Sequence, residues 1–185
     1  SGECIVANER LHSLSGSERV QRAVLALQDP DLQIFSPTCQ KELEFGLEQA
    51  GIDEVERISR IDKISPLLPV NDLDEDPKSL SYGQQKLLSI YSAILIGSPV
   101  LLLDEPTLGL DPLATERIRN IVDCYRAWGR NVILSSHNLE FVKLVADRVI
   151  LIDKGSVIYD GPSGQGISRV KEFYQNQIDE WKSST

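Results

Sequence analysis

The sequence predicts an α/β fold in which a mostly parallel sheet is flanked by helices. Strand-like runs alternate with helix-like segments along the chain, and two of the runs are continuously apolar, as strands of parallel sheets are. The 185 residues suit one domain, and the 41% that are hydrophobic are enough to build its core.

Residues before position 52 are expected to form short strands and one helix. Gly2–Val6 is strand-like and leads into a turn, and Ala23–Gln28 is a short apolar run. Thr38–Ala50 has apolar residues on one helical face, and Gly51 can end this helix in the left-handed conformation.

Residues 52–78 are less regular, and their acidic stretch at 72–76 predicts a solvated loop. A helix is predicted from Ser81 to near Gly97, because this serine can cap it and apolar residues then recur at helical spacing. The other predicted elements are strands buried on both faces at Val100–Leu103 and Asn131–Leu134, helices at Pro112–Trp128 and Leu139–Ala146, a hairpin of Val149–Asp153 and Ser156–Tyr159, and a polar helix at Ser168–Lys182.

The charge and the cysteines exclude several classes of protein. A net charge of −9, from 19 basic and 28 acidic residues, opposes binding to nucleic acid or to anionic lipid. No apolar stretch is long enough to insert directly into a membrane. Cys4, Cys39 and Cys124 form no CxxC pair, which predicts packing residues in a reducing cytosol.

Two carboxylates directly follow the most apolar run of the chain. Asp104 and Glu105 come after Val100–Leu103, and open parallel sheets bind their ligands at the carboxyl ends of the strands. One carboxylate could hold Mg²⁺ while its neighbour orients or deprotonates a water molecule. A helix cap at the end of the strand is the alternative role for this pair.

Two further segments favour binding of a phosphate. Asn131–Leu134 runs into His137, which places an imidazole at the same edge of the predicted sheet, where it could hydrogen-bond a phosphate oxygen. Ser81 and Gly83 lie at a predicted helix start, where exposed N–H groups favour an anion. Taken singly, the histidine and the serine could each have only a structural role.

Together these segments resemble the nucleotide-binding domain of ATP-binding-cassette (ABC) proteins, with its P-loop NTPase-like fold. The matching motifs, in chain order, are Gln28 as the Q-loop glutamine, LSYGQ at 80–84 as the signature, VLLLDEP at 100–106 as the Walker B strand, LGLD at 108–111 as the D-loop, and His137 as the switch histidine. Tyr82 stands where the family signature LSGGQ has its first glycine. QDPDLQIFSPT and KELEFGLE are similar to the ATPases of cobalt, nickel and energy-coupling-factor vitamin importers.

The resemblance implies that four of these residues act in binding ATP and Mg²⁺ and in hydrolysis. Glu105 would be the general base toward the attacking water, and His137 would contact the γ-phosphate. Asp104 would hold the magnesium shell. Gln28 would touch Mg²⁺ or water while sensing a membrane partner.

The resemblance also implies two partners. In a dimer with a second ABC ATPase subunit, identical or different, Ser81, Gly83 and Gln84 would bind the nucleotide of the opposite subunit, and Asp111 would cross the interface near that nucleotide. A transmembrane transporter subunit would meet the chain near residues 35–46. The chain would then lie at the cytoplasmic face of the cell membrane, held there by that subunit.

The resemblance divides the chain into parts of one incomplete domain spanning 1–185. The expected parts are an inserted helical subdomain with the signature at 37–98, a catalytic core with a closing hairpin at 99–160, and a helical tail at 161–185. The phosphate loop GxxxxGK[ST] does not precede Gln28, so we expect the N-terminal part of the nucleotide-binding fold to be absent and the fragment alone to be inactive. Gly161–Ser168 has the spacing of such a loop, but Ile167 replaces its lysine, and a Gly-rich turn capped by Ser168 is predicted instead.

Two alternatives to an importer ATPase stay open. The first is a non-hydrolysing structural module that supplies LSYGQ to a partner's site, which the missing phosphate loop favours and the intact Glu105 and His137 oppose. The second is a soluble nucleic-acid-repair relative, which the charge and the lack of long heptad stretches oppose.

Overall fold

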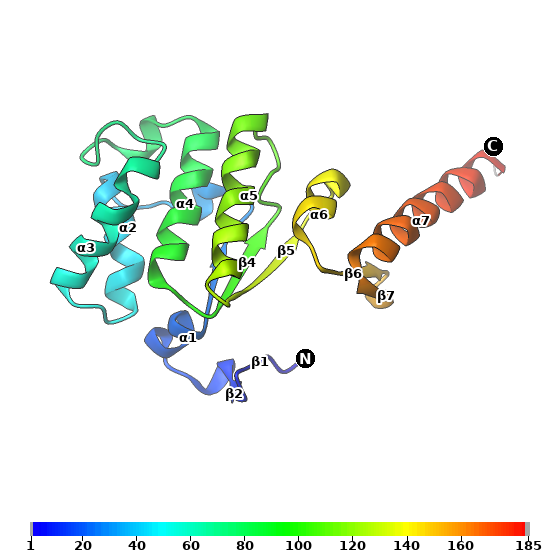
Figure 1. The fold of residues 1–185 in the computed structure, drawn as a ribbon, viewed down its shortest axis with the longest axis horizontal. Helices are drawn as coiled ribbons and strands as arrows, with labels where there is room; N and C mark the ends of the chain where they lie inside the picture. Colours follow the sequence, from blue (N-terminus) through cyan, green and yellow to red (C-terminus); the bar gives the residue numbers. More distant parts are fainter. Residues whose placement is uncertain (1, 184–185) are drawn as a thin grey trace. The chain divides into compact units, whose positions relative to one another are not determined.

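The structure, a computed structural model, describes residues 2–183 and confirms the α/β class (Figure 1). Ser1, Ser184 and Thr185, which end the predicted domain, lie outside the described residues. The chain forms two compact units, Ser1–Ser136 and His137–Thr185.

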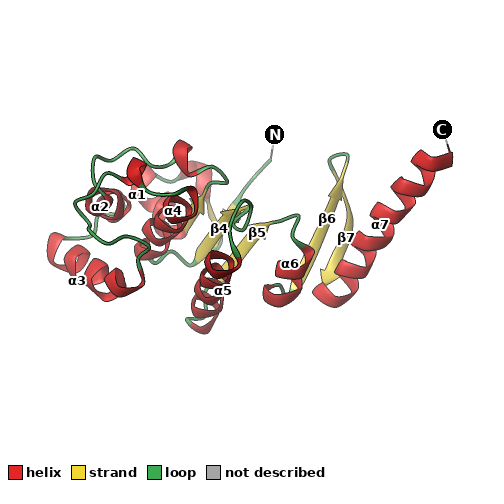
Figure 2. Ribbon diagram, turned by 90° about the horizontal axis from the view of Figure 1, so that it is seen from above, coloured by secondary structure: helices red, strands yellow, loops and turns green. Residues whose placement is uncertain are grey.

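A parallel three-stranded sheet is the centre of the first unit. Its order is β3-β4-β5, with β3 at Ala23–Ala26, β4 at Val100–Asp104 and β5 at Asn131–Ser135. The register pairs Leu25 with Leu102 and Leu102 with Ile133. The predicted strands and their parallel arrangement are therefore confirmed (Figure 2).

The N-terminal elements are shorter than predicted. β1 (Ile5–Val6) and β2 (Glu9–Arg10) form an antiparallel hairpin, whose turn residues Ala7 and Asn8 have positive φ. Helix α1 (Gly16–Arg22) was not predicted. Its start is specified locally, since Ser15 and Glu18 form a reciprocal capping box.

Besides α1, the first unit contains four longer helices, of which α4 and α5 pack on the sheet: α2 (Cys39–Gln49), α3 (Glu54–Ile64), α4 (Tyr82–Ile96) and α5 (Pro112–Ala127). Helix α2 confirms its prediction, with Thr38 as N-cap and Gly51 at φ 74° beyond its end. The prediction of an irregular segment from 52 onward is wrong for α3, whose apolar residues cover only a narrow face and whose Asp53 caps the first turn. The acidic stretch at 72–76 is a loop, as predicted.

One face of the sheet is covered and the other is not. Helix α4 packs on β3 and α5 on β5, and Leu101 and Leu103 on the covered face are buried. On the opposite face Leu25 and Ile133 are exposed by 45% and 60%. The prediction of strands buried on both faces is therefore wrong for this chain, because no helix among residues 2–136 buries that second face.

The first unit also contains short 3₁₀ helices. The 3₁₀ turns are η1 (Leu11–Ser13), η2 (Pro30–Leu32), η3 (Ser65–Leu67) and η4 (Pro77–Ser79).

Only Cys39 confirms the prediction of packing cysteines, because Cys4 and Cys124 are exposed.

The second unit consists of α6 (Leu139–Val145), the antiparallel hairpin β6 (Arg148–Asp153) and β7 (Ser156–Pro162), and α7 (Ser163–Ser183). The predicted turn capped by Ser168 is wrong, because α7 begins five residues earlier and Ser168 lies inside it. Gly166 lets this helix approach the hairpin, since a Cβ there would lie 2.7 Å from the side chain of Val149. Among residues 2–183, no helix combines the length and the apolarity needed to cross a bilayer.

Candidate functional site

The carboxyl end of β4 carries the two predicted acids, and one serine hydroxyl ties them together. Asp104 is the last residue of β4 and pairs with Ser135 of β5. The Ser135 Oγ donates a hydrogen bond of 2.6 Å to Asp104 Oδ1 and accepts one of 3.0 Å from the backbone N–H of Glu105. Pairing of the two strands thus sets the positions of both acids.

Glu105 has an unusual backbone conformation. Its φ is 41°, in the left-handed region that a residue with a Cβ rarely adopts. Such a conformation is costly and persists only where neighbouring contacts hold it. Hydrogen bonds hold it on both sides, at the N–H by Ser135 and at the carbonyl by Lys86, while the residue stays buried.

Lys86 is the buried cation that joins the segments of this site. Only 1% of it is exposed, and its Nζ donates to the backbone oxygen of Glu105 at 2.9 Å and to that of Gln28. Burial lowers the pKa of this lysine, and the negative charges of Asp104 and Glu105 oppose that shift. Lys86 therefore links helix α4 to the chain that follows β3 and to the chain that follows β4.

Sequence reasoning gave no role to Lys86 or to Ser135. The available signal for Lys86 was a lone lysine directly before Leu87 and Leu88, in a helix with many buried apolar residues. That signal did not reveal which carbonyls the lysine would reach, because they lie 58 and 19 residues away in sequence.

The predicted signature segment forms the start of helix α4. Ser81 is its N-cap, and a capping box joins the Ser81 hydroxyl to the Gln84 N–H and the Gln84 side chain to the Ser81 N–H. The Gln84 Nε2 also donates to the carbonyl of Pro69 at 2.8 Å. Both ends of the Gln84 amide are thus engaged within the chain, while its contact with a nucleotide stays a prediction.

Tyr82 and Gly83 bring the other predicted motifs to this helix start. The Tyr82 hydroxyl donates to the backbone oxygen of Gln28 at 3.3 Å, and partial burial raises its pKa. The Tyr82 ring lies 3.3 Å from where a Cβ of Gly109 would be, and the Leu110 side chain lies 3.5 Å from a Cβ at Gly83. The segments matched to the Q-loop, the signature and the D-loop therefore meet within one unit.

Asp111 and His137 are the two remaining predicted site residues. Asp111 caps helix α5, accepting a hydrogen bond of 2.8 Å from the Ala114 N–H. His137 is exposed and is the first residue of the second unit. Contacts from helix α4 reach the backbone oxygens of Gln28 and Glu105. The first unit contains Gln28, Ser81, Gly83, Gln84, Asp104, Glu105 and Asp111.

The fit to magnesium rests on the carboxylate of Asp104. The side chains that the structure describes contain no group of three or more His, Cys, Asp or Glu that could hold a metal by themselves. Mg²⁺ is commonly bound by one or two carboxylates together with phosphate oxygens and water. Asp104, at the carboxyl edge of a parallel sheet, fits a site of this kind but not an all-protein cage.

A parallel sheet whose central strand ends in adjacent acids has its ligand-binding edge at that strand end, as open α/β domains do. A family model described as "AAA domain, putative AbiEii toxin, Type IV TA system" matches residues 17–143. The energy-coupling factor transporter ATP-binding protein EcfA of Methanoculleus marisnigri is 33% identical over 181 residues. The chain belongs to the family of ABC ATPase domains and is similar to those of cobalt and energy-coupling-factor importers.

Two further comparisons agree with this assignment. The cobalt import ATP-binding protein CbiO of Rhodobacter capsulatus is 36% identical over 149 residues, which cover 80% of this chain. The solved structure of cbiO1 from Clostridium perfringens, part of the ABC transporter complex cbiONQ, superimposes with a TM-score of 0.75 and 26% identity, covering 96% of this chain and 72% of that one. The match to EcfA covers 97% of this chain. The chain spans 65% of the length of EcfA and 53% of that of CbiO.

Proposed function

We propose that this chain is part of the ATP-hydrolysing subunit of a cobalt-type or energy-coupling-factor importer, which couples ATP binding and hydrolysis to transport. The observation that carries the proposal is the buried Glu105, held in a left-handed backbone conformation by Ser135 and Lys86 next to Asp104. A general base needs such fixed placement, because proton transfer requires hydrogen-bonding distance to the water that it activates.

In this proposal the chain's own residues have separate roles. Glu105 takes a proton from the attacking water, and Asp104 holds the magnesium ion. When bound, Mg²⁺ neutralises charge on the phosphates. Gln28 has an exposed side chain next to the same strand end and would contact Mg²⁺ or water. His137 would contact the γ-phosphate.

The proposed dimer uses the start of helix α4. The N-terminus of a helix attracts anions through its unpaired N–H groups and its dipole. Ser81, Gly83 and Gln84 would face the nucleotide of a second ABC ATPase subunit there, and Asp111 would lie at the interface. The relative cbiO1 is part of the ABC transporter complex cbiONQ, which supports an assembly of this kind.

The proposed contact with a transmembrane subunit lies between the chain after β3 and helix α2. Leu32 and Phe35 are exposed by 75% and 62%, and the ring of Phe35 packs edge to face on Phe45 at 4.7 Å between centroids. Exposed apolar clusters of this kind mark interaction sites. Crosslinking from Leu32→Cys to a transporter subunit tests this contact, and the same variant at the exposed Val55 of α3 is a matched control.

The proposed division of the domain assigns 37–98 to a helical subdomain, 99–160 to the catalytic core and hairpin, and 161–185 to the tail.

An upstream segment with the phosphate loop would pack on the sheet face that carries Leu25 and Ile133. Large exposed apolar residues on one face of a sheet support this, since such faces are normally covered.

Titration with ATP and Mg²⁺, followed by steady-state ATPase assays, tests the proposal. The chain is compared with a version extended upstream through a phosphate loop. We expect binding and turnover only in the extended version, and loss of turnover in its Glu105→Gln variant. An extended version that binds ATP without hydrolysing it, assembled with its partners, would instead establish the non-hydrolysing structural module.

A further inference from the structure

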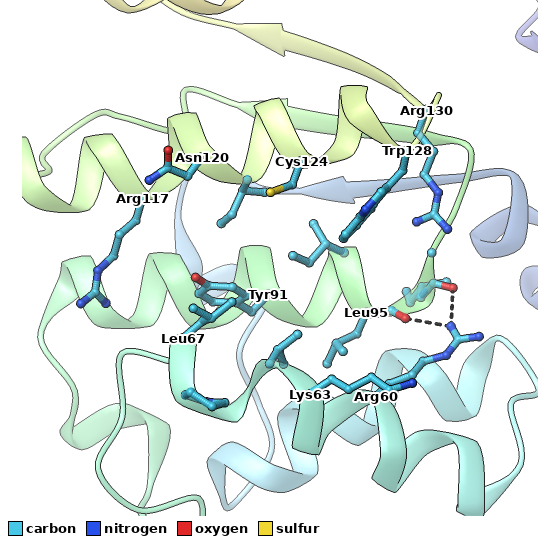
Figure 3. Close-up of a pocket in the computed structure, with 16 residues that line it drawn as sticks. Arg60, Lys63, Leu67, Tyr91, Leu95, Arg117, Asn120, Cys124, Trp128 and Arg130 are labelled. Atoms are coloured by element: carbon cyan, nitrogen blue, oxygen red, sulfur yellow. Dashed lines mark hydrogen bonds between the residues drawn. The ribbon is translucent and has the colours of Figure 1, made fainter.

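A pocket of about 720 Å³ lies among α3, α4 and α5, away from the candidate nucleotide site (Figure 3). It is at the C-terminal end of α4, whereas Ser81 and Gly83 are at the N-terminal end of that helix. Pockets of roughly 300–1,000 Å³ are the usual size for small-molecule sites. Its floor includes Leu67, Tyr91, Leu95 and Trp128, which supply aliphatic and aromatic surface.

The charged side chains that line this pocket are all basic. The lining includes Arg60, Lys63, Arg117 and Arg130 and no acidic side chain, although the whole protein carries a net charge of −9. Arg60 already binds the carbonyls of Leu95 and Ile96 and pairs with Glu56. The other three cations form no ion pair with any side chain that the structure describes.

The cations lie at both ends of an apolar floor. Figure 3 shows Arg117 at one end and Arg60 with Arg130 at the other. Arg60 and Arg130 converge on Gly97, since a Cβ there would lie 3.6 Å and 3.3 Å from their guanidinium nitrogens. Tyr91 lies near Arg117. The rise per residue of an α-helix places Tyr91 roughly 9 Å from Gly97 along the axis of α4.

We propose that this pocket binds an amphipathic organic anion, with an apolar body over Trp128, Tyr91 and Leu95 and an acidic group at one or both ends. Arg130 lies over the rings of Tyr125 and Trp128, which orients its guanidinium at the pocket without neutralising it. Guanidinium groups are suited to carboxylates and phosphates, because their planar fork can donate two parallel hydrogen bonds. The proposal is independent of the proposed ATPase function.

A native cysteine can report whether a ligand occupies the pocket. Cys124 lines the pocket and is exposed, whereas Cys4 is exposed elsewhere and Cys39 is buried. The probes are decanoate and decanedioate, with decylammonium as the matched cation of the same chain length, all below the concentration of micelle formation. Alkylation of each cysteine by neutral iodoacetamide is followed by mass spectrometry of the peptides, with Cys4 as the internal reference.

We expect both acids to slow alkylation of Cys124 severalfold and to leave Cys4 unchanged, while decylammonium protects neither. In the double variant Lys63→Gln/Arg117→Gln, half-protection should require at least about tenfold more acid, the usual effect of losing charged hydrogen bonds. Lys171→Gln, which removes an exposed charge from α7, should behave like the unaltered chain. Equal protection by decylammonium, no protection by the acids, or an unchanged double variant would overturn the proposal.

Discussion

The ammonium group of Lys86 donates a hydrogen bond of 2.9 Å to the backbone oxygen of Glu105. The same group binds the backbone oxygen of Gln28, so the residue matched to the Q-loop and the residue matched to the catalytic base share one buried cation. A shift of helix α4 would therefore act on both residues at once. We expect this lysine to matter for stability and for the geometry of the site.

Lys86→Met should reduce the free energy of unfolding by about 1–3 kcal/mol, because the two carbonyls lose their donor and the apolar side chain offers no replacement. Urea denaturation measures this change. Lys78→Met, at an exposed position, should stay within about 0.5 kcal/mol of the unaltered chain. A Lys86→Met variant as stable as the unaltered chain would show that the two hydrogen bonds contribute nothing net.

Glu105→Gln in the upstream-extended protein should lower the ATPase rate by about 10²- to 10⁴-fold and leave ATP affinity nearly unchanged. The amide keeps the size of the side chain but cannot accept the proton of water. Steady-state turnover and calorimetric titration separate the two effects. Glu54→Gln, an exposed substitution in α3, is the matched control, and near-normal turnover in Glu105→Gln would remove this residue as the base.

Ser135→Ala should lower turnover of the extended protein while changing ATP affinity little. The hydroxyl is the shared partner of Asp104 Oδ1 and the Glu105 N–H, so its loss releases both acids from β5. Ser135→Thr, which keeps the hydroxyl, should restore much of the rate. If Ser135→Ala and Ser135→Thr lose turnover equally, packing rather than the hydrogen bonds accounts for the effect.

Stability should fall as the pH rises from 9 to 11, because of the thiol of Cys39. Burial, with smaller contributions from the charges of Glu75, Asp76 and Glu42, raises its pKa from 9.0 to about 11. The unfolded chain therefore releases this proton first, and unfolding becomes more favourable by about 2 kcal/mol across this range.

The Cys39 prediction is measured as the slope of the unfolding free energy against pH. Cys39→Ala should remove this component of the slope, whatever its effect on stability at neutral pH. Cys124→Ala, which removes an exposed thiol, should leave the slope unchanged. Equal slopes in the Cys39→Ala variant and the unaltered chain would show that the folded thiol ionises as in the unfolded chain.

Features set by short-range pattern were predictable from the sequence. The apolar runs ending at Asp104 and Ser135 specified parallel strands, and Ser81 specified the start of α4 through its capping box. Helix α3 was missed although its signals are local, namely the Asp53 cap and an apolar residue at every third position from 55 to 64. The likeness in motif order led to the ABC family, and the comparisons confirmed it.

The tertiary structure alone decided the features that depend on contacts between distant segments. The burial of Lys86, the double hydrogen bond of Ser135 and the left-handed backbone of Glu105 each require strands or helices far apart in sequence to meet. The cationic pocket is of the same kind, because α3, α4 and α5 bring its charges together only when they pack. Local sequence specifies where elements begin and end, whereas long-range packing determines which side chains share one environment.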